Sequence, residues 1–214
     1  MPYLVVILGR ALAVGAGFGA ATSLVNALSH SHADLSSRAY TTSGWSVAEI
    51  VSVLLDSGWA WAGLAVAVGG LVTRAGESRP AAPTQGGAAA GALALLAATA
   101  AYSIVDTIRS GGQIPWYESE PSIWWVASVV FGAPLGAVGA RVRQPGAIGL
   151  LARLTVPVGA AVQMVVLPPG RNEVVETIGK TIVWTVAAAS IGLIVVHFLL
   201  VERRRRFLAA AESP

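Results

Sequence analysis

The sequence is short of charge and lacks cysteine altogether. Charged residues make up 12% of its 214 residues and hydrophobic residues 55%, whereas about a quarter of a soluble domain is usually charged. The absence of cysteine excludes disulfides, thiolate metal sites and cysteine nucleophiles. With a mean hydropathy of +0.67, this composition predicts a polytopic membrane protein.

Several catalytic motifs are also missing. The sequence contains no His-x-x-x-His pair, no Asp-rich prenyl-diphosphate motif and no nucleophile elbow. His30, His32 and Asp34 are close in sequence, but we expect them in a solvated polar loop rather than around a metal. We therefore expect neither a metal nor another cofactor, and we set aside serine hydrolase chemistry.

Basic residues are concentrated in one place. Arg203 to Arg206 form the only basic run, directly after an apolar segment. This position is typical of an anchor on anionic lipid heads at the cytoplasmic surface. We expect a lipid bilayer as the surroundings, the cell membrane as the location, and no nucleic-acid partner.

The hydrophobic pattern predicts an all-α transmembrane bundle of six helices in residues 1–202, followed by a short basic cytoplasmic tail in 203–214. The first span runs straight from the N-terminal residues without the basic start of a cleaved signal, so we expect it to be retained. Its Gly15 to Gly19 run indicates close helix packing. We expect Asn172 to cap the last span. The six expected spans are Tyr3 to Leu28, Ser46 to Thr73, Gly86 to Ile108, Ile123 to Ala140, Ala147 to Leu167, and the residues after Asn172 to Val201.

The distribution of charge predicts the orientation. If both termini are cytoplasmic, ten of the fourteen basic residues lie at the inner side, as the positive-inside rule requires. Eight of the eleven acidic residues then lie in the outer half or in outer loops, which is a separate asymmetry. The inner basic residues are Arg10, Arg74, Arg79, Arg141, Arg143, Arg153 and Arg203 to Arg206.

The second expected span carries acids at an unusual depth. On one continuous helix, a single stripe would hold Glu49, Ser52, Asp56, Trp59 and Gly63. Measured from Ser46, Asp56 would lie about 15 Å deep, near the middle of a hydrocarbon layer of about 30 Å. An ionisable group at that depth is a candidate functional residue.

Acids among aromatic side chains in an apolar site suit one kind of chemistry. We expect burial to keep Asp56 and Asp106 protonated near neutral pH, so that a carboxyl can protonate an isoprenoid alkene or epoxide while aromatic faces attract the resulting carbocation. We assign Asp56 as the acid, Glu49 as the residue that orients it, and Asp106 or Glu118 as the final proton acceptor. The lipophilic substrate would contact the aromatic residues Trp59, Tyr102, Trp116, Tyr117 and Trp124.

Other interpretations stay open at this stage. Asp56 can instead form a structural hydrogen bond with Arg10, Asn26 or Gln163. A small proton-coupled transporter would use the intramembrane acids to bind and release protons. A membrane scaffold or accessory subunit would use its glycine-rich faces to dock a partner, and its acids would be structural.

Two stretches resemble known proteins. Gly91 to Asp106 and Phe131 to Gly139 look like a group of small six-helix actinobacterial membrane proteins of unassigned function. Chain size, six spans and intramembrane acids are also similar to the small bacterial membrane-bound cyclases that close farnesylated indoles and related meroterpenoids. The resemblance implies a cyclase fold and activity, and we assign the acids from the chemistry above alone.

Overall fold

The computed structural model describes residues 2–35, 45–75, 83–109, 111, 119–168 and 172–211. Every regular element in these ranges is an α-helix, so the all-α prediction is confirmed for the described residues. The helices are α1 (Pro2–Leu35), α3 (Val47–Asp56), α4 (Gly58–Ala75), α5 (Pro83–Arg109), α6 (Ser119–Gly139), α7 (Gly146–Val166) and α8 (Glu173–Ala211).

Most of these helices are suited to a bilayer. Among the described residues, five are long and apolar enough to cross a membrane, and a sixth span results if the bent pair α3 and α4 is counted as one. Length and composition therefore indicate a multi-pass membrane protein, with five or six of the six predicted spans recovered.

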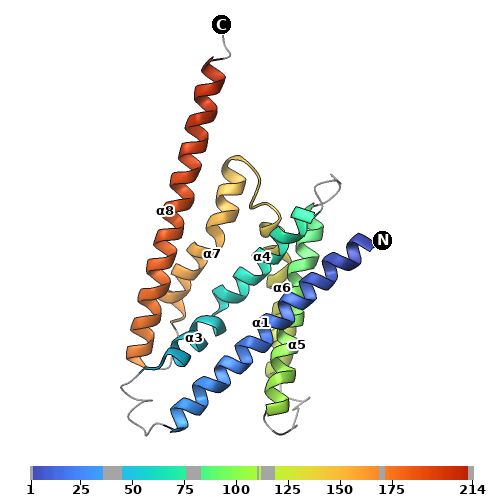
Figure 1. Ribbon diagram of the computed structural model, residues 1–214, viewed down its shortest axis with the longest axis vertical. Coiled ribbons are helices and arrows are strands. Elements are labelled where there is room, and N and C mark those ends of the chain that lie inside the picture. The colour runs from blue at the N-terminus through green and yellow to red at the C-terminus, as the bar shows by residue number, and fades with distance from the viewer. Residues whose placement is uncertain are drawn as a thin grey trace.

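Successive spans run in alternating directions: α1 descends from its start at mid-height, and α8 ascends to the top of the molecule (Figure 1). α5 has the central position, because it packs most extensively against α1 and α6 and also contacts α4. α8 packs mainly against α7 at the edge of the bundle.

Small residues set the distances around α5. A Cβ atom on Gly15 or Gly19 would collide with the backbone of Ala94 or Ala98, respectively. Gly17, between them, has open space beside it. The predicted packing role of the Gly15 to Gly19 run is confirmed for its two ends, where α1 approaches α5 at backbone contact.

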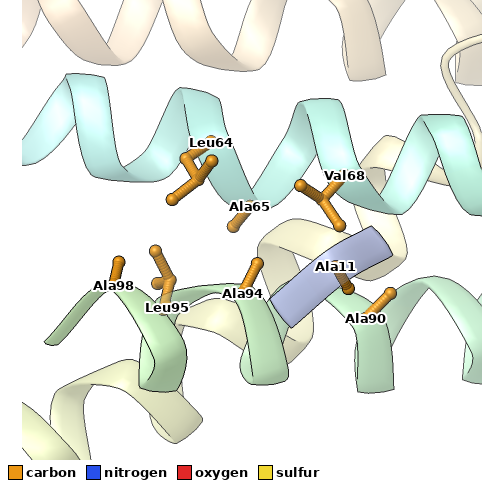
Figure 2. Close-up of a cluster of buried hydrophobic side chains, with 8 residues drawn as sticks. All are labelled: Ala11, Leu64, Ala65, Val68, Ala90, Ala94, Leu95 and Ala98. Atoms are coloured by element: carbon orange, nitrogen blue, oxygen red, sulfur yellow. The ribbon is translucent and has the colours of Figure 1, made fainter. Parts of the chain in front are cut away.

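The largest buried apolar cluster joins α1, α4 and α5 (Figure 2). Its alanines on α5 lie four residues apart, on the face that meets Ala11 of α1 and Leu64 of α4. A four-residue spacing keeps side chains on one face of a helix, so the Ala-rich sequence of α5 specifies a smooth, closely packed surface. The cluster consists of Ala11, Leu64, Ala65, Val68, Ala90, Ala94, Leu95 and Ala98.

One expected loop is helical, α8 extends beyond the expected span, and one predicted cap is confirmed. α1 continues to Leu35, so His30, His32 and Asp34 lie on a helix rather than in a loop. α8 likewise continues beyond Val201 to Ala211, without a break at the basic run. The side chain of Asn172 accepts a hydrogen bond of 2.9 Å from the backbone N–H of Val175, as expected for an N-cap.

Candidate functional site

The second expected span is broken in the middle. α3 ends at Asp56, α4 begins at Gly58, and the two helices meet at an angle of 59°. Ser57 between them has an extended backbone, with φ −70° and ψ 139°. A Ser-Gly pair is a common cause of a sharp kink, and here it separates Asp56 from the second half of the predicted span, which begins at Gly58.

Two of the polar groups at the break have well-defined partners. The Ser57 hydroxyl donates to the Val53 carbonyl at 2.5 Å. The backbone N–H of Trp59 donates to the side-chain oxygen of Gln163 on α7 at 2.8 Å. Because an unpaired backbone group is costly in an apolar layer, these bonds make the break a stable feature rather than a fault in the helix.

The break overturns the predicted single stripe. Ser52 is completely buried, whereas Asp56 is exposed at the end of α3. Trp59 lies beyond the break and packs against Ala160, Met164 and Val183 of α7 and α8. Asp56 and Trp59 therefore do not share the face of one helix, because the stripe assumed an uninterrupted helical repeat.

A hydrogen-bonded group lies where α1, α3 and α5 meet. Ser52 donates to the side-chain oxygen of Asn26 at 2.5 Å, and the Asn26 amide nitrogen donates to the Tyr102 hydroxyl oxygen at 3.1 Å. Asn26 and Ser52 are buried. The three side chains form a chain of hydrogen bonds in which Ser52 donates to Asn26 and Asn26 donates to Tyr102. Among the described residues, no acceptor binds the proton of the Tyr102 hydroxyl, which can therefore donate to a further group.

Aromatic rings extend this group toward α4. The ring of Trp61 lies 6.4 Å from that of Tyr102 and 5.5 Å from that of Phe18, both with edge-to-face geometry. Such pairs are favourable beyond their buried area. We refer to Phe18, Asn26, Ser52, Trp61 and Tyr102 together as the Tyr102 cluster.

Two of the predicted acids lie near this cluster. The carboxyls of Asp56 and Asp106 both interact electrostatically with the Tyr102 hydroxyl. Asp106 is in the last turn of α5, where it is exposed and pairs with Arg109 at 3.9 Å. Asp56 is exposed and, among the described residues, has no hydrogen bond or ion pair. Neither carboxyl has the burial by protein that the sequence led us to expect.

The remaining predicted residues lie elsewhere. Glu49 is in the first turn of α3, where its backbone N–H donates to the hydroxyl of the N-cap Ser46 at 3.1 Å. It is seven residues from Asp56, about 10 Å along a helix, and no hydrogen bond joins the two side chains. Trp124 is exposed on α6 and makes no ring contact with another described aromatic residue. Trp116, Tyr117 and Glu118 lie outside the described residues.

The structural partners considered for Asp56 are engaged differently. Asn26 binds Ser52 and Tyr102, Gln163 caps α4, and Arg10 is exposed on α1. Within the described ranges no three His, Cys, Asp or Glu side chains are grouped so as to hold a metal ion.

Sequence reasoning underrated three members of the cluster. Asn26 entered only as a partner for Asp56, Ser52 only as part of the stripe, and Phe18 had no assigned role. The available signal was the amide itself, because an Asn inside an apolar span usually bonds across helices. Nothing in the sequence indicated which helix would supply its partners.

Comparisons with protein-family models, with curated proteins and with solved structures found no match to this chain.

Proposed function

We propose that the protein is a membrane-embedded cyclase that protonates an isoprenoid alkene or epoxide, with Asp56 as the acid. The observation that supports this proposal best is that Asp56 of α3 and Asp106 of α5 both interact electrostatically with Tyr102 of α5. A protonated carboxyl beside aromatic rings provides both the proton and the faces that attract a carbocation.

In this scheme the substrate gains one proton from Asp56 and loses one proton to Asp106. The Asp56 carboxyl transfers its proton to one alkene carbon or to the epoxide oxygen, and the electron pair of the next double bond closes the ring on the cationic carbon. Asp106 then removes a proton from a neighbouring carbon as the final double bond forms. The guanidinium of Arg109 lies beside Asp106 and balances the charge of its ionised form.

The exposure of Asp56 suits a lipophilic substrate. In a bilayer, a side chain exposed at mid-depth meets hydrocarbon instead of water. An isoprenoid dissolved in the same layer would reach Asp56 laterally, without passing through water.

We also propose that the protein lies in the cell membrane with both termini in the cytoplasm. Arg141 and Arg143 in the α6–α7 turn and the arginines at the end of α8 lie toward the same end of the bundle (Figure 1). This placement supports a cytoplasmic position for that end.

A product assay tests the cyclase. Membranes that contain the wild type, Asp56→Asn or the control Glu173→Gln are supplied with farnesylated and geranylgeranylated indoles and their epoxides. Glu173 is an exposed acid of α8. We expect cyclised product from the wild type and the control, and at least a hundredfold loss with Asp56→Asn, since general acid catalysis contributes about 10²–10⁴. Cyclised product from all three samples would mean that a residue other than Asp56 is the acid.

A proton-coupled transporter is the second candidate, because the α3–α4 break is a feature that it would explain. Discontinuous helices commonly form substrate and ion sites in transporters, and Asp56 is the last residue of α3. If no membrane sample forms cyclised product, an assay in proteoliposomes with an internal pH-sensitive dye distinguishes the transporter from the cyclase. Proton entry that depends on an added lipophilic substrate and is lost in Asp56→Asn would support transport and contradict the cyclase.

A further inference from the structure

α8 is the longest of the described helices, and it is longer than a bilayer is thick. It has 39 residues, about 58 Å at a rise of about 1.5 Å per residue, whereas the hydrocarbon layer is about 30 Å thick. Its upper end rises clear of the neighbouring helices (Figure 1). Part of α8 must therefore lie outside the hydrocarbon layer.

The charges on α8 define which part that is. Residues 181–201 contain no Asp, Glu, Lys or Arg and extend about 31 Å, which matches the hydrocarbon thickness. Lys180 pairs with Glu176 just before this segment, and Arg203 to Arg206 follow it after Glu202. The arginine run therefore lies at the level of the lipid headgroups.

The helical conformation arranges the four arginines in a ring. Successive residues on an α-helix are about 100° apart, so four in a row point in every direction around the axis. All four are exposed. Among the described residues only Arg206 has an acidic partner, Glu202 at 3.6 Å. The guanidinium groups thus surround α8 and are accessible from every side.

We propose that this arginine ring binds the phosphate groups of several anionic phospholipids in one leaflet. Guanidinium groups bind phosphate oxygens in paired hydrogen bonds, and anionic headgroups are the phosphates present at that depth. An RNA or DNA strand would instead need a continuous basic surface directed into water, which a ring at the end of a membrane span does not provide.

The test uses the full-length protein in nanodiscs that contain four parts phosphatidylcholine and one part phosphatidylglycerol. Native mass spectrometry counts the lipids that stay bound to the released protein. We expect phosphatidylglycerol to be enriched on the wild type and to decrease about fivefold for each arginine changed to Gln, with similar effects at positions 203, 204 and 205.

Two variants serve as controls. Arg141→Gln with Arg143→Gln removes two exposed arginines from the α6–α7 turn and should leave most of the enrichment. Replacing all four arginines of the ring by Lys keeps the charge and should retain more phosphatidylglycerol than replacing them by Gln. Circular dichroism and size-exclusion chromatography verify that each variant is folded.

Three results would overturn the proposal. One is equal enrichment in the wild type and the quadruple Gln variant while both are folded. Another is loss of the enrichment in 50 mM inorganic phosphate at constant ionic strength, which would indicate a site for free phosphate. The third is a short DNA duplex that displaces phosphatidylglycerol from the wild type. None of these results bears on the cyclase, because the assay contains no isoprenoid.

Discussion

At the scale of single residues, Asn26 joins three helices. Its amide accepts from Ser52 on α3 and donates to Tyr102 on α5. Asn is well suited to this position because one short side chain carries both a donor and an acceptor. The hydrogen bonds fix the rotation of α1, so the position of the Tyr102 hydroxyl depends on a residue that takes no part in the proposed chemistry.

We expect Asn26→Leu to destabilise the protein by about 1 kcal/mol, since it removes two interhelical hydrogen bonds, each worth about 0.6 kcal/mol in a membrane protein. Thermal unfolding in detergent measures the change. Thr185→Val is the control, because Thr185 is exposed and its hydroxyl bonds only within its own helix. An Asn26→Leu midpoint equal to that of the control would contradict this role.

At the scale of elements, packing around α5 depends on residues without side chains. Gly136 of α6 faces Gly87 and Gly91 of α5, and it also meets Gly69 of α4. In lipid, where apolar burial gives little drive for association, such contact allows dispersion between backbones to hold helices together. The bundle is therefore sensitive to any added methyl group at these crossings.

Gly19→Ala and Gly17→Ala form a matched pair. The methyl group of Gly19→Ala would collide with the backbone of Ala98, whereas Gly17 has no neighbour within 4 Å. We expect Gly19→Ala to lower the free energy of unfolding by about 1–3 kcal/mol and Gly17→Ala to leave it unchanged or slightly higher. Unfolding in increasing sodium dodecyl sulfate provides the measurement, and equal midpoints would disprove the contact.

At the scale of the whole molecule, the alternating spans determine which loops face each side. The chain has no cysteine, so a single introduced thiol reports its own position without background. With cytoplasmic termini, Arg141→Cys and Leu208→Cys should react with a membrane-impermeant maleimide only in inverted vesicles. Trp45→Cys, at the start of α3, should react only in right-side-out vesicles. Labelling of all three from one side would refute the alternating arrangement.

The sequence predicted helices well where apolar runs end at charges or caps. The span expected at Gly86 to Ile108 differs from α5 by a few residues, and Asn172 was recognisable as an N-cap. The α3–α4 break was missed, because the Ser57-Gly58 pair also fits an intact apolar helix. It is stabilised by Gln163, a residue 104 positions from its partner Trp59, and a periodic pattern contains no information on such a contact. For the same reason, the Tyr102 cluster could be found only in three dimensions.

The bond between Asn26 and Tyr102 has a consequence for how the protein is made. The two residues are 76 positions apart, so α1 leaves the ribosome and enters the bilayer well before its main partner, α5, has been synthesised. Until then, α1 exposes to lipid the polar side chains that are buried in the finished bundle, namely Thr22, Ser23, Asn26 and Ser29. Ser52 of α3 is the first interhelical partner that Asn26 can meet, and we expect the face of α1 that packs on α5 to stay uncovered until the third span arrives.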